Sequence, residues 1–226
     1  MQDFSVDHLR AALDQSLRRL GTEDVDVYQL HGPGAADPAL VDALRELALT
    51  GKVRRIGVGA EDVTSAASWA HTSGDDGSAA VDVIQLPFGP LDPEAATEVF
   101  PAAADHRIEL WVRGVFGGGV FGLLREQPSS LSPADRAKAT AVTEIADELG
   151  LDLFALAVAF VRSFDDASTI VLGTSSIDHL QHNVELVRCA EPLPDDIVRR
   201  IAGVVAASNA EHAPVPVAEG DLRGGS

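Results

Sequence analysis

The stretch VDVYQLHGPG, Val25 to Gly34, decides the fold of this chain. Its first six residues are typical of a strand buried in a parallel sheet, and the glycine and proline residues after them indicate a turn. In α/β enzymes the catalytic groups lie at the C-terminal ends of such strands. The stretch therefore predicts a functional position for His31, and the rest of the chain decides what can act with it.

Strands and helices alternate along the rest of the sequence. The segment from Ser5 to Gly21 has leucines at helical spacing between a serine cap and a terminal glycine, so it predicts an amphipathic helix. Further strands are expected from Val53, Val81, Ile108 and Thr169, and helices at 38–50, 61–71, 93–104, in two pieces at 133–164, from Ser176 and from Pro194. This alternation predicts an α/β fold with a parallel sheet and right-handed crossovers.

The number of strands limits the architecture. A closed (β/α)8 barrel needs eight strands and typically ~250 residues, whereas this chain of 226 residues offers about five strands. We therefore expect an open sheet or an incomplete TIM-type (β/α)8 barrel over residues 1–208. Residues 209–226 are rich in Pro, Gly and Ala, which predicts a disordered tail.

The composition argues against two classes of partner. The chain carries 17 Lys and Arg against 35 Asp and Glu, a net charge of −18, whereas nucleic-acid affinity depends on clustered basic residues. No apolar run approaches the ~20 residues that a membrane span needs. The first residues, MQDFSVDHLR, lack the basic and apolar regions of a signal peptide, so a cytoplasmic location is expected.

Five segments, in this order, resemble the aldo-keto reductase family. They are SLRRLGTEDVDVYQLHGP, GKVRRIGVGAEDV, VDVIQLPFGPLD, ELWVRGVFGGGVF and ALAVAFVRSFDDASTIVLGTSSIDHLQHNVE. The resemblance implies an eight-stranded barrel that binds NADP(H) across its C-terminal face and reduces small-molecule carbonyl compounds. It also aligns the strand at Val25 with the fourth strand of the family barrel, so the family's first three strands have no counterpart in this sequence.

The resemblance implies that His31 matches the active-site histidine that polarises the substrate carbonyl. In the family this histidine acts with an Asp, a Tyr and a Lys from segments that precede the first helix found here. The only tyrosine, Tyr28, should point to the opposite side of the strand from His31. Lys52 precedes a strand and Lys138 lies in a later helix, so neither is expected near His31. The chain is predicted to be inactive as a reductase.

Part of the family's cofactor site is also replaced. The Ser-Asn pair that holds the cofactor amide in the family reads Gly59 and Ala60 here, whereas the glutamine on the next strand is retained as Gln85. Gln85 could equally be a polar residue satisfied inside a barrel layer. Arg113 stands where relatives place a residue that stacks on the nicotinamide, and the glycine-rich segment Gly114–Gly122 matches a mobile loop that covers the cofactor.

The turn after the last strand offers a second part of that site. Backbone N–H groups at a helix start, together with the helix dipole, form an anion site. By resemblance this turn and the first part of its helix face the adenosine and its 2′-phosphate through Gly173, Thr174, Ser175, Ser176, His179, Gln181, His182 and Asn183. His179 stands where NADP-preferring relatives often carry Arg. The alternative is ordinary N-capping, and no metal site is expected because nothing completes the His179 and His182 pair.

Three hypotheses for the function remain open. The first is that the chain is an aldo-keto reductase polypeptide without its N-terminal part, through a late start codon or gene truncation. The second is a repurposed binding protein or non-redox acid/base enzyme, cyclase-like or lyase-like, that uses the pocket around His31. The third is a subunit completed by another chain. Its partner would be a small carbonyl compound or a nucleotide. Unpaired edges on the first and last strands further predict self-association.

Overall fold

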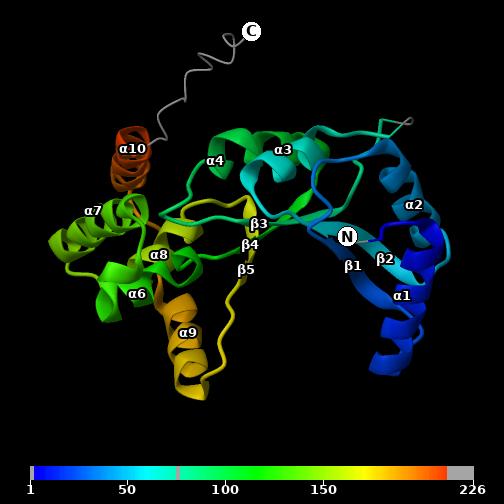
Figure 1. Cartoon of the computed structure of the whole chain (residues 1–226), viewed down its shortest axis with the longest axis horizontal. Coiled ribbons are helices and arrows are strands. Elements are labelled where there is room, and N and C mark those ends of the chain that lie inside the picture. The colour runs from blue at the N-terminus through cyan, green and yellow to red at the C-terminus, as the bar shows by residue number, and fades with distance from the viewer. Residues whose placement is uncertain (1–2, 75–76, 213–226) are drawn as a thin grey trace, which may run out of the picture.

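The structure is a computed structural model that describes residues 3–74 and 77–212 (Figure 1). Five parallel strands form one sheet in the order β1-β2-β3-β4-β5. They are β1 Val25–His31, β2 Val53–Gly59, β3 Val83–Pro87, β4 Glu109–Arg113 and β5 Ala167–Val171. Within the described residues β1 and β5 each pair along one edge only, so the sheet is not closed. The expectation of an α/β fold with five parallel strands is confirmed.

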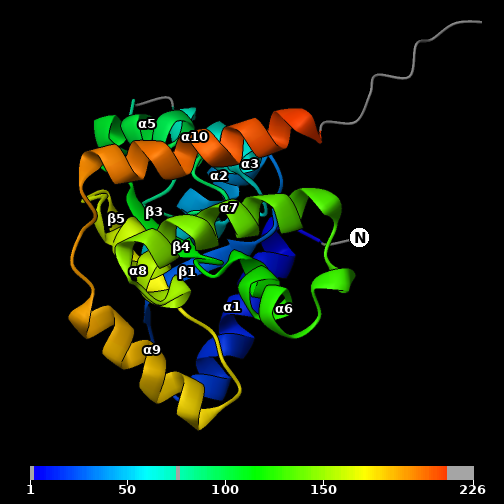
Figure 2. The ribbon, with the colours of Figure 1, turned by 90° about the vertical axis from the view of Figure 1, so that its left-hand side faces the viewer.

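Helices connect the successive strands, because parallel neighbours need a crossover connection. Their bounds are α1 Val6–Leu20, α2 Pro38–Ala48, α3 Val63–His71, α4 Ala95–Glu98, α5 Phe100–His106, α6 Val120–Glu126, α7 Pro133–Leu149, α8 Leu153–Arg162, α9 Ile177–Cys189 and α10 Asp195–Glu211, with short 3-10 turns at Gly117–Gly119 and Pro128–Ser130. α7 and α10 lie side by side (Figure 2), and Arg200 donates to both carboxylate oxygens of Glu148 at 2.6 and 2.7 Å. None of the helices in the described part of the chain could cross a membrane.

Helix α1 has the buried leucines and the two end residues that the sequence predicted. Leu9, Leu13 and Leu17 are buried along one side of the helix, and the Ser5 hydroxyl accepts the backbone N–H of His8. Gly21 ends the helix at φ +69°, a left-handed conformation that glycine adopts without a Cβ penalty.

The two faces of the sheet differ in chemistry because successive residues of a strand point to opposite sides. One face is apolar: the register pairs Leu30 with Val58 and Val58 with Ile84, and these side chains are buried. The other face, which we call the polar face, carries Gln29, His31, Arg55, Gln85, Glu109, Trp111 and Arg113. The polar face therefore carries the candidate functional groups of the sheet.

Three local details differ from the sequence-based expectations. The helix expected at 93–104 is split into α4 and α5 at Val99, whose φ of −115° departs from the usual helical value of about −63°. The unexpected helix α6 begins within the glycine-rich segment and extends beyond it, and Phe121 anchors this helix by complete burial. α10 continues to Glu211, so residues 209–211 of the predicted tail are helical, and residues 213–226 lie outside the described part.

Candidate functional site

His31 stands in a row of residues that crosses the C-terminal part of the sheet. The register aligns His31 on β1 with Gly59 on β2, Gly59 with Gln85 on β3, and Gln85 with Trp111 on β4. The His31 side chain is exposed, and a Cβ placed on Gly59 would lie 4.0 Å from the Gln85 side-chain oxygen. Because Gly59 has no side chain, the backbone is uncovered between the His31 imidazole and the Gln85 carboxamide.

Arg113, the last residue of β4, reaches across the strand ends. Its Nη2 donates to the carbonyl oxygen of Ala60 at 2.8 Å and to that of Glu61 at 3.5 Å. In residues 3–74 and 77–212 no carboxylate forms an ion pair with Arg113. The half-buried guanidinium is thus a fixed positive charge beside Gly59. Its predicted stacking on a nicotinamide ring stays a prediction.

Glu61 brings a carboxylate to the end of β1. Gly32, which follows His31, has φ +59°, and a Cβ built on it would lie 2.5 Å from Glu61 Oε1. The Glu61 side chain therefore folds back over the residue after His31. The next residue, Asp62, caps α3 by accepting the N–H of Ser65 at 2.7 Å. The helix expected at 61–71 placed Glu61 at a helix start, and its approach to β1 was not anticipated.

A polar cluster lies lower on the same face. Glu109 forms an ion pair with Arg55 and accepts Trp111 Nε1–H at 2.8 Å. The hydrogen bond from Trp111 lowers the pKa of Glu109; burial opposes this, and the contacts with Arg55 and Ser168 add to the lowering. The carboxylate is thereby held in its charged form beneath the His31 row.

The tyrosine and both lysines of the chain lie away from His31. Tyr28 pairs with Ile56 on the apolar face and packs against the core, and burial raises the pKa of its hydroxyl. Lys52 is a surface residue whose Nζ lies 2.7 Å from an Asp14 oxygen. Both placements agree with the sequence-based expectation that these residues cannot act with His31.

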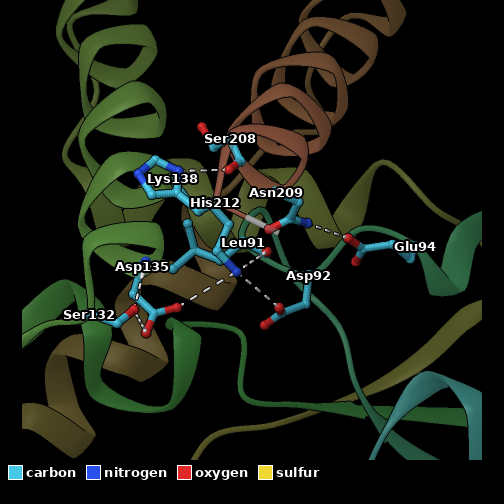
Figure 3. A network of polar contacts seen from close by, with 9 residues as sticks. All are labelled: Leu91, Asp92, Glu94, Ser132, Asp135, Lys138, Ser208, Asn209 and His212. Carbon is cyan, nitrogen blue, oxygen red and sulfur yellow. Dashed lines mark hydrogen bonds and ion pairs between the residues drawn. The ribbon is translucent and has the colours of Figure 1, made fainter. Parts of the chain in front are cut away.

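Lys138 is held elsewhere, on α7 (Figure 3). Its Nζ lies 3.7 Å from carboxylate oxygens of Asp92 and Asp135 and 3.5 Å from the Leu91 carbonyl, and only 12% of its side chain is exposed. Figure 3 shows the ammonium between these oxygens, near the contact of Glu94 with Asn209. Lys138 thus joins α7 to the loop after β3.

A cavity of about 440 Å³ lies between the glycine-rich segment, the start of α8 and the start of α9. It is lined by Phe116, Gly119, Gly122, Arg125, Phe154, Gly173, Thr174, His179, His182 and Asn183. Five residues predicted for the adenosine end are thereby brought together: Gly173, Thr174, His179, His182 and Asn183. Ser175 and Gln181 are exposed and do not line the cavity.

The strongest charge in the cavity was not foreseen from the sequence. Arg125 on α6 donates to Asp152 at 2.7 Å, and its guanidinium carbon lies 5.0 Å from the centre of the Phe154 ring. Burial raises the pKa of Asp152, but the hydrogen bonds from Arg125 and the Phe154 N–H outweigh it and hold the pKa below its ordinary value. An arginine just after the glycine-rich segment was the available signal.

The start of α9 is capped by its own side chains. Ser176 accepts the His179 N–H at 3.4 Å, and Thr174 Oγ1 accepts the Ser176 N–H at 3.1 Å. The capping alternative is therefore realised here, alongside any binding role. Among the described residues no group of three or more His, Cys, Asp or Glu side chains could hold a metal ion.

The family model of the Aldo/keto reductase family matches residues 1–206. The chain belongs to the aldo/keto reductase family. Among curated relatives of this aldo/keto reductase, Protein tas of Escherichia coli is 26% identical over 231 residues, covering 87% of this chain and 66% of its own length. Pyridoxal 4-dehydrogenase of Microbacterium luteolum is 25% identical, covering 86% and 60%. The chain thus spans less than two thirds of these relatives.

Solved structures give the same assignment. The holo form of aldo-keto reductase AKR11C1 from Bacillus halodurans matches with a TM-score of 0.71 and 27% identity, over 90% of this chain and 66% of that one. The glycerol dehydrogenase AKR11B4 from Gluconobacter oxydans matches with a TM-score of 0.67 and 20% identity, over 98% and 69%, which shows the shared fold. The aldo/keto reductase predicted from sequence motifs is therefore confirmed as a family member.

Proposed function

We propose that this aldo/keto reductase family protein binds NADP(H), mainly through the adenosine half, in the cavity at the start of α9. The observation that carries the proposal is the meeting of Arg125, two aromatic rings and a helix N-terminus around one cavity. Arg125 offers a planar donor to a phosphate, and the dipole of α9 favours an anion at its N-terminus. Phe116 and Phe154, with ring centres 5.0 Å apart, offer aromatic surface to a purine.

The residues at the nicotinamide end fit less well. Gly59 and Ala60 have no side-chain donors for a carboxamide, so Gln85 is the one predicted amide contact that the polar face keeps. A bound nicotinamide would supply hydride chemistry, and His31 would orient a carbonyl oxygen by donating a hydrogen bond to it. The weak fit supports binding in which the adenosine end supplies most of the affinity.

We further propose that the 226-residue chain does not reduce carbonyl compounds by itself. His31 lies at the end of β1, whereas Tyr28 points to the apolar face and both lysines are engaged elsewhere. A positioned proton donor typically contributes two to four orders of magnitude in rate, so about that much is missing. A role for His31 in binding or in a non-redox acid/base step is the second candidate, favoured by the approach of Glu61 to Gly32.

Calorimetry with 2′,5′-ADP and NADP⁺ tests the binding proposal. Nearly equal affinities are expected, because both ligands share the adenosine contacts. An NADP⁺ affinity far above that of 2′,5′-ADP would contradict the proposal, since it requires strong nicotinamide contacts. A panel of small aldehydes followed at the NADPH absorbance tests the second part, where turnover that His31→Ala abolishes would refute the predicted inactivity.

A further inference from the structure

We propose that the polar face over the C-terminal part of the sheet binds a small carboxylate, of the 2-oxo acid class, through His31 on β1, Gln85 on β3 and Arg113 on β4. This site is separate from the nucleotide cavity and does not depend on a bound nucleotide. Its three side chains lie on one face of one sheet, and each comes from a different strand. They therefore approach the bare backbone of Gly59 from different sides.

Arg113 supplies the charge that an anion needs. Both of its hydrogen bonds use Nη2, toward Ala60 and Glu61, so its other N–H groups have no partner among the described residues. The two carbonyl oxygens fix the guanidinium without neutralising it. A carboxylate binds such a planar fork through two parallel hydrogen bonds, which favours Arg over Lys at this position.

Gly59 supplies the space. Adjacent strands lie about 4.8 Å apart, so His31 and Gln85 stand about 10 Å from each other with Gly59 between them. A Cβ on Gly59 would meet nothing closer than the Leu30 carbonyl oxygen at 3.5 Å. Gln85 Oε1 lies 4.0 Å from the same Cβ position, so a small molecule over Gly59 would meet the Gln85 carboxamide directly.

The side-chain amide of Gln29, on β1, also lacks a hydrogen-bond partner among the described residues. The Nε2 atom of Gln29 is buried and lacks a hydrogen bond among the described residues, and its side chain lies over Gly57, one pleat below Gly59. A buried donor without an acceptor costs about 1–3 kcal/mol. The unmet donor of Gln29 therefore lies on the same face as the proposed site, one pleat from Gly59.

The charge around the site favours a monoanion over a phosphate dianion. The Glu61 carboxylate lies against Gly32, next to His31, and would repel a second negative charge more strongly. In a 2-oxo acid the carboxylate can pair with Arg113 while the adjacent keto oxygen accepts from Gln85 or His31. The class therefore uses all three groups with one small molecule.

The site adjoins the nucleotide cavity along the same edge of the sheet. Arg113 is in register with Val171, two residues before Gly173 of the cavity. A carboxylate on Arg113 and 2′,5′-ADP in the cavity should therefore bind together. NADP⁺ should compete with the carboxylate, because its nicotinamide end would extend toward Arg113.

Saturation-transfer NMR and calorimetry with pyruvate, acetate and inorganic phosphate test the proposal on the full chain. Pyruvate should bind more tightly than acetate, and acetate more tightly than phosphate. Arg113→Gln should weaken pyruvate binding about tenfold, and Arg113→Lys about threefold, because lysine keeps the charge but loses the fork. Arg125→Gln, in the nucleotide cavity, is the matched control and should leave pyruvate affinity unchanged.

Three results would overturn the site: absence of pyruvate binding, phosphate binding as tight as pyruvate binding, or equal losses in Arg113→Gln and Arg125→Gln. Thermal unfolding checks that Arg113→Gln is folded. If it is not, Gln85→Leu replaces it, with an expected loss of about threefold from one hydrogen bond, and unchanged affinity in that variant would also refute the proposal. Binding of 2′,5′-ADP is measured alongside, so failure here is distinct from failure of the nucleotide proposal.

Discussion

The guanidinium of Arg125 donates to the carboxylate of Asp152 at 2.7 Å while it lies over the ring of Phe154. The ion pair joins α6 to the first turn of α8, because Asp152 is also the N-cap that accepts the Phe154 N–H at 2.8 Å. A phosphate in the cavity must therefore share Arg125 with Asp152. Substitutions of Arg125 or Asp152 should therefore change the affinity for a nucleotide.

Opposite changes in affinity are expected from the two partners. Arg125→Gln should weaken 2′,5′-ADP binding about tenfold, because it removes a charge-assisted hydrogen bond. Asp152→Asn should strengthen binding about threefold, because it frees Arg125 while an asparagine still caps α8. Calorimetry measures both. Arg136→Gln, at the start of α7, is the control; losses in both cavity variants would mean that the pair only holds α6 in place.

Two glycines on β2 should differ sharply in their tolerance of a side chain. A Cβ on Gly57 would lie 2.8 Å from the backbone oxygen of Val83, whereas one on Gly59 makes only ordinary contacts. Gly57→Ala should therefore lower the free energy of unfolding by about 1–3 kcal/mol, through overpacking at the sheet centre. Gly59→Ala should change it by less than about 1 kcal/mol. Urea unfolding of both variants decides this, and equal costs would contradict the β2-β3 geometry.

Glu109 should give the protein a pH-dependent contribution to stability. Its folded-state pKa lies below its ordinary value of 4.5, so the contribution is fully present above that value and is lost as the pH falls through the folded-state pKa. Glu109→Gln should lower the free energy of unfolding by about 1–2 kcal/mol at neutral pH and by progressively less below about pH 4.5. Urea titrations at several pH values test this.

The control for Glu109 is Glu126→Gln on α6, an exposed substitution expected to stay within about 0.5 kcal/mol at neutral pH. A Glu109→Gln difference that does not shrink in acid would show that the Trp111 and Arg55 contacts do not favour the charged form.

Self-association through the unpaired edges of β1 and β5 remains a prediction. β1 and β5 each have one sheet partner in the described residues, and α9 exposes Ile177 by 72% and Leu180 by 51%. An exposed apolar edge favours association with another chain. Light scattering after size exclusion should show a species larger than the monomer.

Charge on α9 should reverse that association. Leu180→Glu combined with Val184→Glu should shift the protein toward monomer, whereas Leu49→Glu, another exposed leucine, should not. A compact monomer with a sharp thermal transition in the unmodified chain would show that the five strands are self-sufficient.

Local sequence features were sufficient to predict a structural element where the residues that determine it lie close together in the chain. The caps at Ser5 and Gly21 fixed both ends of α1, and the apolar stretch from Val25 placed His31 at a strand end. α6 was missed because glycines on both sides of Val120 weaken its helix signal, while its anchor, Phe121, is stabilised by burial among distant residues.

The sequence by itself determined the strand and helix order, the family and the identity of the polar residues at strand ends. The tertiary structure alone decided which of them meet. Arg113 contacts Ala60 across 53 positions, and Arg125 contacts Asp152 across 27. Helical and strand periodicity reports which way a side chain points over a few residues, but long side chains bridge elements whose separation is set by how the sheet and helices pack.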